Sequence, residues 1–175
     1  MKRLILMRHA KTEAWAEGID DFGRALTEQG HLDARRIAEE IVSQGWSPAR
    51  ILVSTARRAR ETCSEVAKVV EGERVRPMES LYLSGARGIA DAVRQNDSAS
   101  TLMVIGHNPG LHDFALNIMR EGGSSDFTSS ERLLEKFPTS CAALFEADED
   151  GAFLPVHFRL ADVLRARDYR EAGTA

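Results

Sequence analysis

This sequence of 175 residues has few cysteines, no excess of positive charge and no long apolar run. Its two cysteines, Cys63 and Cys141, lie far apart and form no CxxC motif, so we expect neither a disulfide framework nor a thiolate metal site. The formal net charge is -4, whereas DNA or RNA surfaces need a basic stripe on the protein that binds them. We therefore expect no nucleic-acid partner.

The chain has no apolar stretch of the length that spans a membrane, so we expect no membrane partner. The apolar residues after Met1-Lys2-Arg3 resemble the start of a signal peptide. Arg8 interrupts them before a hydrophobic region of about 7 to 15 residues is complete. Together with the low cysteine content, this predicts a reducing, cytoplasmic setting.

The composition fits one domain. With 43% hydrophobic and 29% charged residues, the chain has ordinary globular proportions and enough length to bury a sizeable core. The sequence shows no repeat, no low-complexity block and no interdomain linker, so we expect a single domain over residues 1–175.

Apolar runs that predict strands alternate with segments of helical periodicity. Buried strands are predicted at residues 4–7, 51–53 and 102–105, a weaker strand at 74–78, and a closing pair at 142–146 and 153–158. Helices are predicted after Thr27, at about 59–70, at 89–93 and at 111–119, followed by a loop at 122–130. The pattern predicts an α/β fold: a three-layer αβα sandwich whose mainly parallel central sheet has a late antiparallel strand and helices on both faces.

Histidine and arginine residues follow all three of the clear strands. The strands end in Arg8-His9, in the segment from Ser54 to Arg58, and in Gly106-His107-Asn108. Because ligands of open α/β sheets bind outside the carboxyl ends of the strands, we expect these side chains to meet in one pocket. Two histidines with two or three arginines make a cationic cradle, for which the sequence shows no obvious compensating acid. Such a cradle suits an anion.

Each of these residues also has an ordinary structural explanation. An Arg-His pair after a strand can be a solvated turn, and most histidines are structural or surface residues. The agreement of three independent strand ends favours a catalytic His9 over that alternative. Arg57, Arg58 and Arg60 lie close together at a predicted helix start, so at most one or two of them can face the pocket. Cations at a helix N-terminus oppose the macrodipole, which makes a bound anion there more plausible.

The segment Leu6-Met7-Arg8-His9-Ala10 resembles the signature of the histidine phosphatase superfamily, in the variant where alanine replaces the usual glycine. That variant resembles the SixA-type phosphohistidine phosphatase branch. Further matches are Arg24 to Gly30, Ser54 to Thr62, Leu81-Tyr82, Val104 to Gly110, and Phe137-Pro138-Thr139. Each motif is short, but together they occur in the family's order from residue 3 to about residue 146.

The resemblance implies roles for four residues. His9 matches the nucleophile that becomes transiently phosphorylated, Arg8 and Arg58 match the phosphate-binding arginines, and His107 matches the second histidine of the phosphate pocket. Arg58 is preferred to Arg57 because it lies four residues after Ser54, where the family places its arginine. Family members need no metal or organic cofactor, so none is expected here. We also expect the neighbouring cations to favour the neutral, nucleophilic form of His9.

Glu79 and Asn108 complete the predicted site. Asn108 is expected to help bind the substrate. Glu79 follows the predicted strand at 74–78, in the region where many family members supply a general acid. The alternative is a solvated loop glutamate, because the SixA-type branch can lack a dedicated acid there. A phosphoramidate can be protonated on the substrate itself, so the role of Glu79 depends on which substrate is cleaved.

The sequence thus predicts a metal-independent phosphatase that acts through phospho-His9, with protein phosphohistidine as the favoured substrate. No long insertion separates the motifs, which leaves the pocket open to a protein surface. The alternatives are a small phosphorylated substrate cleaved by the same mechanism, a non-catalytic phosphoprotein-binding module, or a metallohydrolase. Retention of His9 disfavours the binding module. A mutase is disfavoured because a phosphorylated intermediate must be enclosed to be kept from water.

Overall fold

The computed structural model describes residues 1–15, 17–18, 20–70, 72 and 74–170. It contains a six-stranded sheet in the order β3-β2-β4-β1-β5-β6. The strands are β1 (Arg3–Arg8), β2 (Arg50–Ser54), β3 (Arg74–Met78), β4 (Thr101–Gly106), β5 (Ala142–Ala147) and β6 (Phe158–Leu164). The first four run parallel to one another, whereas β5 runs antiparallel to both β1 and β6. This confirms the predicted mainly parallel sheet with a late antiparallel strand.

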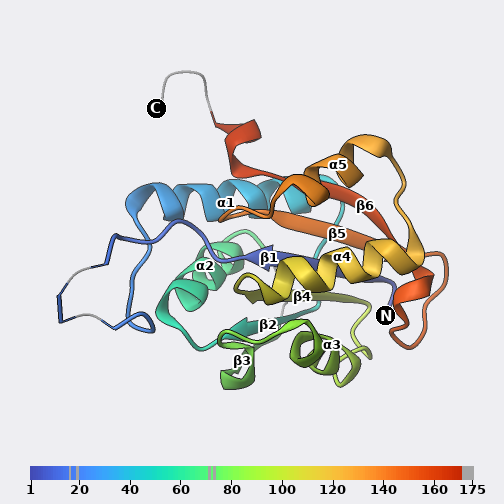
Figure 1. Ribbon diagram of the computed structural model, residues 1–175, viewed down its shortest axis with the longest axis horizontal. Helices are drawn as coiled ribbons and strands as arrows, with labels where there is room; N and C mark the ends of the chain where they lie inside the picture. Colours follow the sequence, from blue (N-terminus) through green and yellow to red (C-terminus); the bar gives the residue numbers. More distant parts are fainter. Residues whose placement is uncertain (16, 19, 71, 73, 171–175) are drawn as a thin grey trace.

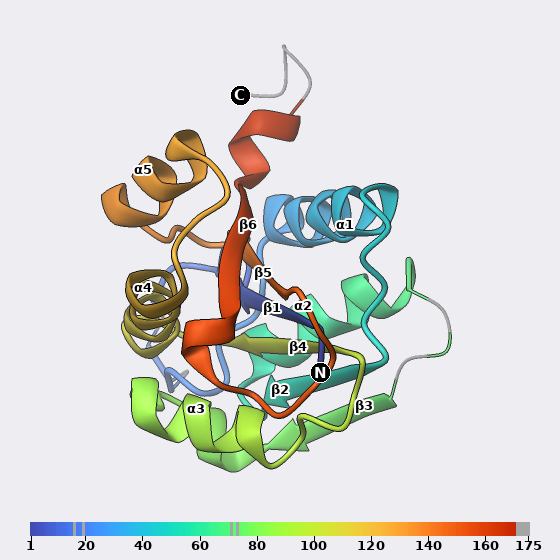
Figure 2. The same cartoon turned by 90° about the vertical axis from the view of Figure 1, so that its right-hand side faces the viewer.

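Helices cover both faces of the sheet, as predicted. Figure 2 shows α1 (Glu28–Ser43) and α2 (Arg57–Ala67) on one side of it, and α3 (Ala86–Arg94), α4 (Gly110–Gly122) and α5 (Phe127–Glu135) on the other. The alternation of β1 divides its side chains between the two layers. Leu4 and Leu6 belong to the core under α3, α4 and α5, and Ile5 and Met7 belong to the core under α1 and α2. Within the described part of the chain, no helix is both long and apolar enough to cross a membrane.

The start of α1 is fixed beside the segment that follows β1. The Thr27 side chain caps the helix by accepting a hydrogen bond from the backbone N–H of Gly30 at 3.0 Å, as the sequence predicted. The carbonyl oxygen of Lys11 accepts from the backbone N–H of Thr27 at 2.9 Å. A Cβ atom at position 30 would collide with that same carbonyl, so glycine allows the close approach. The polar loop between Lys11 and Thr27 is thereby closed at its base.

Two late elements differ from the sequence prediction. Residues 153–158 were expected to form a strand, but Pro155 to His157 form a 3-10 turn (η2, Pro155–His157) and β6 begins only at Phe158. Phe153 and Phe158 are buried in the core, whereas Leu154 and Val156 are exposed, so the apolar run is a turn between two packed phenylalanines and not a paired strand. The expected loop at residues 122–130 contains the start of α5, which Asp126 caps by accepting from the backbone N–H of Ser129 at 2.8 Å. After β6 the chain forms a short 3-10 helix, η3 (Ala166–Tyr169).

Candidate active site

The carboxyl ends of β1, β2 and β4 deliver their polar side chains to one edge of the sheet. In the register, β4 lies between the other two strands, and Arg8 pairs with Gly106. The rings of His9 and His107 lie 5.1 Å apart, centroid to centroid. Arg8 and Arg58 both lie close enough to these two rings to disfavour their protonation. We call the set Arg8, His9, Arg58 and His107 the cationic cradle.

His9 is held in one tautomer at the end of β1. Its Nδ1 atom lies 2.9 Å from the carbonyl oxygen of Ala10. Because a carbonyl only accepts, Nδ1 carries the proton and Nε2 keeps its lone pair. Burial lowers the pKa of His9 to about 3, and the nearby His107, Arg58 and Arg8 add to that effect against the Ala10 hydrogen bond. The imidazole is therefore neutral, as expected, although burial contributes more than the neighbouring cations.

The segment from Phe137 to Cys141 anchors the residues at the end of β1. The Arg8 Nη1 group donates to the carbonyl oxygen of Phe137 at 3.1 Å, and the Asn108 Nδ2 group donates to the same oxygen at 2.8 Å. The backbone N–H of Ser140 donates to the carbonyl oxygen of His9 at 3.2 Å, and that of Arg8 donates to the carbonyl oxygen of Cys141 at 3.0 Å. These backbone contacts fix Arg8 and His9. Asn108 shares the anchor of Arg8, and its contact with a substrate stays a prediction.

Arg58 is the arginine of its cluster that faces the site. Its side chain is buried in the first turn of α2, whereas Arg57 and Arg60 are exposed and Arg57 pairs with Glu61. The Arg58 Nη2 group lies 2.9 Å from Asp21 Oδ2, and Nη1 donates to the backbone carbonyl of Asp21. The cradle thus has a compensating acid. This corrects the expectation of an uncompensated cradle, which missed Asp21 because it lies in a loop without periodicity or a motif.

His107 is oriented from the end of β2. Its Nε2 atom lies 2.8 Å from the hydroxyl oxygen of Ser54, which in turn accepts a weak hydrogen bond from the backbone N–H of Ala56 at 3.4 Å. Because the described residues offer the Ser54 hydroxyl hydrogen no other acceptor, we infer that the hydroxyl donates to Nε2, which places the His107 proton on Nδ1. That Nδ1 is buried and has no hydrogen-bond partner among the described residues. Burial, followed by the charge of Arg58, lowers the pKa of His107 to about 4.

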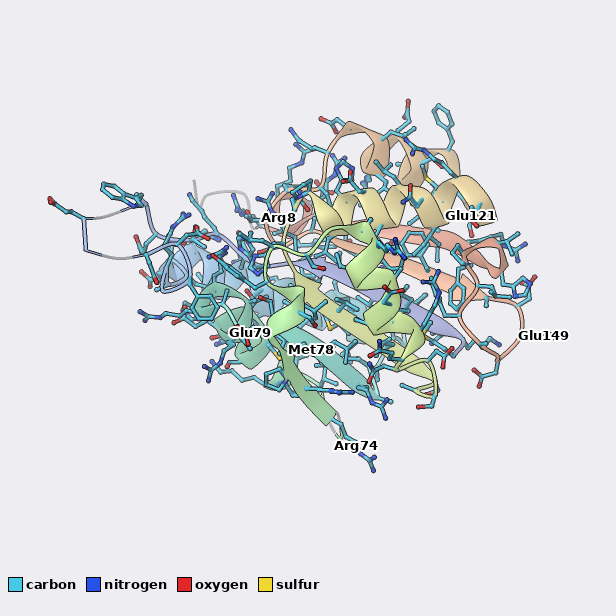
Figure 3. The ribbon with its side chains drawn as sticks, turned by 60° about the horizontal axis from the view of Figure 1, so that its bottom comes forward. Arg8, Arg74, Met78, Glu79, Glu121 and Glu149 are labelled. Carbon is cyan, nitrogen blue, oxygen red and sulfur yellow. The ribbon has the colours of Figure 1, made fainter. Side chains whose placement is uncertain are left out.

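Glu79 lies at the same edge of the sheet but outside the cradle. It begins a 3-10 turn (η1, Glu79–Leu81) directly after β3, and its side chain is exposed. Figure 3 shows Glu79 next to Met78 at the end of β3, with Arg8 lying apart from both. Among the described residues, no side-chain hydrogen bond or ion pair joins Glu79 to the cradle. The role of Glu79 stays a prediction.

The cradle can bind a tetrahedral oxyanion against a neutral nitrogen nucleophile. Arg8 and Arg58 keep N–H groups beyond those bonded to Phe137 and Asp21, and the His107 ring adds one more donor. Arginine matches phosphoryl oxygens in charge and in geometry. In the described part of the chain, no group of three or more His, Cys, Asp or Glu side chains could hold a metal ion. The arrangement therefore offers charge stabilisation and a nucleophile from its own side chains.

Comparisons with known sequences find similarity along most of the chain. A family profile described as the histidine phosphatase superfamily (branch 1) matches residues 4–82, which include Arg8, His9 and Arg58. An uncharacterized chloroplastic protein of Arabidopsis thaliana is 32% identical over 165 residues, covering 87% of this chain and 74% of that protein. An uncharacterized protein of Mycobacterium tuberculosis is 34% identical over 145 residues, covering 79% of this chain and 85% of that protein.

Comparisons with solved structures find the same fold. A structure assigned as a phosphohistidine phosphatase SixA from Agrobacterium tumefaciens matches with a TM-score of 0.78 and 27% identity, covering 94% of this chain and 97% of that one. The structure of the protein histidine phosphatase SixA complexed with tungstate matches with a TM-score of 0.74, covering 96% and 99%. Its identity is 22%, so this second likeness concerns the fold alone.

Proposed function

Because the chain belongs to the histidine phosphatase superfamily, in its SixA-type branch, and is a phosphatase, we propose that it hydrolyses protein phosphohistidine through phospho-His9. One observation carries the proposal. The Nδ1 atom of His9 is committed to Ala10, so the neutral ring presents the Nε2 lone pair within a cradle of two arginines and a second histidine. A site that only bound phosphate would need the cations, but not a nucleophile in this tautomer.

In the proposed reaction, each side chain of the cradle has a separate role. Arg8 and Arg58 hold the non-bridging oxygens of the phosphoryl group, and the Nδ1–H of His107 donates to the same group. His9 Nε2 attacks phosphorus, and water then hydrolyses phospho-His9. Phosphoryl transfer needs positioning and charge stabilisation above all, and buried arginines supply both.

Protein phosphohistidine is the proposed substrate for two reasons. The exposed Glu79 makes no described side-chain bond to the cradle, which suits a leaving group that needs no strong acid. The Agrobacterium structure is assigned to phosphohistidine phosphatases, which supports the same substrate class for this chain. The alternative is a small phosphate monoester, for which Glu79 would protonate the departing alkoxide.

The deciding experiment compares a phosphohistidine-bearing carrier protein with a panel of phosphate monoesters, using wild type and His9→Ala. We expect the wild type to release phosphate fastest from phosphohistidine and His9→Ala to release none. An active His9→Ala enzyme would exclude the mechanism, and much faster ester cleavage would favour the small-molecule alternative. The same assay with excess chelator distinguishes the proposed enzyme from a metallohydrolase. The proposed enzyme keeps its full activity with the chelator, whereas a metallohydrolase loses it.

Arg57 provides a matched control for Arg58. Both belong to the first turn of α2, but only Arg58 is buried against the cradle. We expect Arg58→Ala to lower kcat/KM by about 100-fold or more, since one charge-stabilising donor contributes on the order of 3 kcal/mol to the transition state. Arg57→Ala should change it by less than about twofold. Equal losses in the two variants would contradict the assignment of Arg58.

A further inference from the structure

The carboxylate of Asp21 is held in place beside the cationic cradle. Its Oδ2 atom accepts hydrogen bonds from Arg58 Nη2 at 2.9 Å and from the Tyr82 hydroxyl at 3.0 Å. Its Oδ1 atom accepts from Arg24 Nη1 at 3.2 Å. Three donors from three separate segments therefore hold one acid in place. The proposed hydrolysis by Arg8, His9, Arg58 and His107 leaves this acid without a role.

The Asp21 carboxylate can accept one more hydrogen bond. An ionised carboxylate has about four acceptor positions, and the described contacts use two on Oδ2 and one on Oδ1. The side chain is 48% exposed, so the remaining position is open to a ligand. Partial burial opposes ionisation, but the hydrogen bonds from Tyr82 and Arg58 outweigh it and lower the pKa of Asp21. At neutral pH, Asp21 therefore accepts protons in hydrogen bonds and has none to donate.

Asp21 is far more exposed than the nucleophile it neighbours through Arg58, with 48% of its side chain exposed. His9 is only 8% exposed and forms the floor of the site, so the bond to the leaving group points outward, in line with the attack of Nε2. The loop that carries Asp21 extends beyond the carboxyl ends of the strands, as Figure 1 shows at the left of the molecule. Tyr82, whose hydroxyl holds Asp21, has its ring against the ring of His107 at 5.6 Å. The acid is thus tied to the cradle on two sides, through Arg58 and Tyr82.

We propose that Asp21 is a specificity-determining residue that accepts a hydrogen bond from the ring N–H of a substrate phosphohistidine. The inference rests on the proposed function and names the atom of this chain that selects a phosphoramidate over an ester. The site then holds two imidazoles in the same way. The carbonyl oxygen of Ala10 accepts a hydrogen bond from the N–H of His9, and the carboxylate of Asp21 accepts one from the N–H of the protonated substrate ring.

The transfer step balances without a general acid. The substrate ring is protonated on the nitrogen that does not carry phosphorus, and Asp21 stabilises that cationic form. The lone pair of His9 Nε2 forms the new P–N bond, and the electron pair of the old P–N bond returns to the substrate ring. The substrate leaves as a neutral imidazole that keeps its one ring proton. His9 now carries the phosphoryl group and the positive charge, until water attacks phosphorus, the pair returns to Nε2 and the proton of water leaves to solvent.

An alkyl phosphate gains nothing from this arrangement. Its leaving group departs as an alkoxide, which has no N–H to donate and needs a proton that ionised Asp21 cannot supply. The negative charge of Asp21 also opposes the charge that develops on a departing alkoxide. The same carboxylate therefore favours one class of substrate and disfavours the other.

The test is a selectivity ratio in Asp21→Asn, which keeps the shape of the side chain and removes its charge. The substrates are phosphoimidazole, whose ring has an N–H in its protonated form, and p-nitrophenyl phosphate, whose leaving group needs no proton. We expect the ratio of their kcat/KM values, phosphoimidazole over p-nitrophenyl phosphate, to fall by about tenfold or more, since a hydrogen bond to a charged group contributes ~1.5 kcal/mol or more. In the variant, phosphoimidazole turnover should also decline at a lower pH, because the protonated substrate ring is less stabilised.

Tyr82→Phe is the control, because it removes a hydrogen bond to Asp21 and leaves the carboxylate in place. We expect it to keep the ratio within about threefold of wild type. If Asp21 only positioned Arg58, Asp21→Asn would lower both activities by the same factor, and an unchanged ratio would overturn the inference. So would an equal change of the ratio in Tyr82→Phe. A wild type that cleaves p-nitrophenyl phosphate but not phosphoimidazole would instead refute the proposed substrate, and the inference with it.

Discussion

The Nδ1 atom of His9 and the carbonyl oxygen of Ala10 lie 2.9 Å apart in a buried part of the site. The backbone N–H of Ala10 donates to the Thr62 hydroxyl at 3.0 Å, and that hydroxyl donates to the carbonyl oxygen of Arg58 at 2.7 Å. A short chain of hydrogen bonds thus joins the nucleophile to the helix turn that carries Arg58. The position of the Nε2 lone pair and that of the buried arginine are fixed by the same contacts.

A covalent phosphoenzyme is the first prediction that follows from the His9 tautomer. Rapid quenching with labelled phosphohistidine should trap label on the protein, and the label should be stable in alkali and lost in acid, as expected for a P–N bond. His9→Asn should trap none. His157→Asn is the control, because His157 is exposed and makes no described contact with the cradle. Label that survives acid would contradict attack by a histidine.

The hydrogen bond between Ser54 and His107 gives the second prediction. Ser54→Ala removes the donor that places the His107 proton on Nδ1, so part of the population adopts the other tautomer. We expect kcat to fall about fivefold with a smaller change in KM, because a neutral hydrogen bond contributes ~1 kcal/mol. Steady-state kinetics with the phosphohistidine carrier measures this. Ser64→Ala is the control, since the exposed Ser64 bonds only to its own helix at Arg60, and an equal effect of the two substitutions would contradict the role of Ser54.

The sequence predicts the site wherever periodicity and topology carry the information. Four apolar residues before Arg8 define a strand buried on both faces, and the rule that ligands bind at the carboxyl ends of parallel strands brings His9 and His107 together before any coordinates exist. The choice of Arg58 over Arg57 needed the family spacing, since three arginines at one helix start look alike. In the structure, Arg58 is the one of the two that is buried.

The parts that were missed have no signature in the sequence. Asp21 lies in a polar loop without periodicity, so only the three-dimensional path of that loop brings it to Arg58. Phe137 belongs to a segment that matches the family, but its contact with Arg8 uses a backbone carbonyl, which every residue has, so the match does not predict that contact. The apolar run 153–158 predicts a strand too early, although only Phe153 and Phe158 of it are buried. The start of α5 is rich in serine and threonine, which is typical of a loop. Asp126 as a cap was the one available signal for α5.

Glu79 gives the third prediction, which depends on the leaving group. Glu79→Gln should leave turnover of phosphohistidine within about twofold of wild type, because a protonated imidazole needs no further acid. Any residual activity on alkyl phosphates should fall by about tenfold or more, since general acids contribute at least that much. Glu149→Gln is a control at an exposed glutamate far from Glu79 in Figure 3. A large loss of phosphohistidine turnover in Glu79→Gln alone would show that the leaving imidazole does take its proton from this residue.

The fourth prediction concerns stability, because the two buried histidines also make folding depend on pH. Burial first of all lowers the pKa of His9 to about 3 and that of His107 to about 4, whereas both titrate near 6.5 in the unfolded chain. Below pH 6.5 the unfolded chain therefore binds more protons than the folded one. The stability that the two neutral rings contribute is fully present above about pH 6.5, and it declines as the pH falls toward 4.

Urea unfolding at pH 7 and pH 5 measures this decline. We expect the free energy of unfolding to fall by on the order of 1 to 2 kcal/mol for each of the two histidines. His9→Asn and His107→Asn should each remove their own share of the difference, whereas His157→Asn, at an exposed residue, should remove none. Glu65 does not contribute to the difference between pH 7 and pH 5. Burial opposes its ionisation, but hydrogen bonds led by those from Lys68 and Arg35 lower its pKa to about 2. The stability that ionised Glu65 contributes is therefore lost only below about pH 4.5. Equal stability at pH 7 and pH 5 in the wild type would show that the two rings can be protonated in the folded state, and His9 would then not be held neutral for attack.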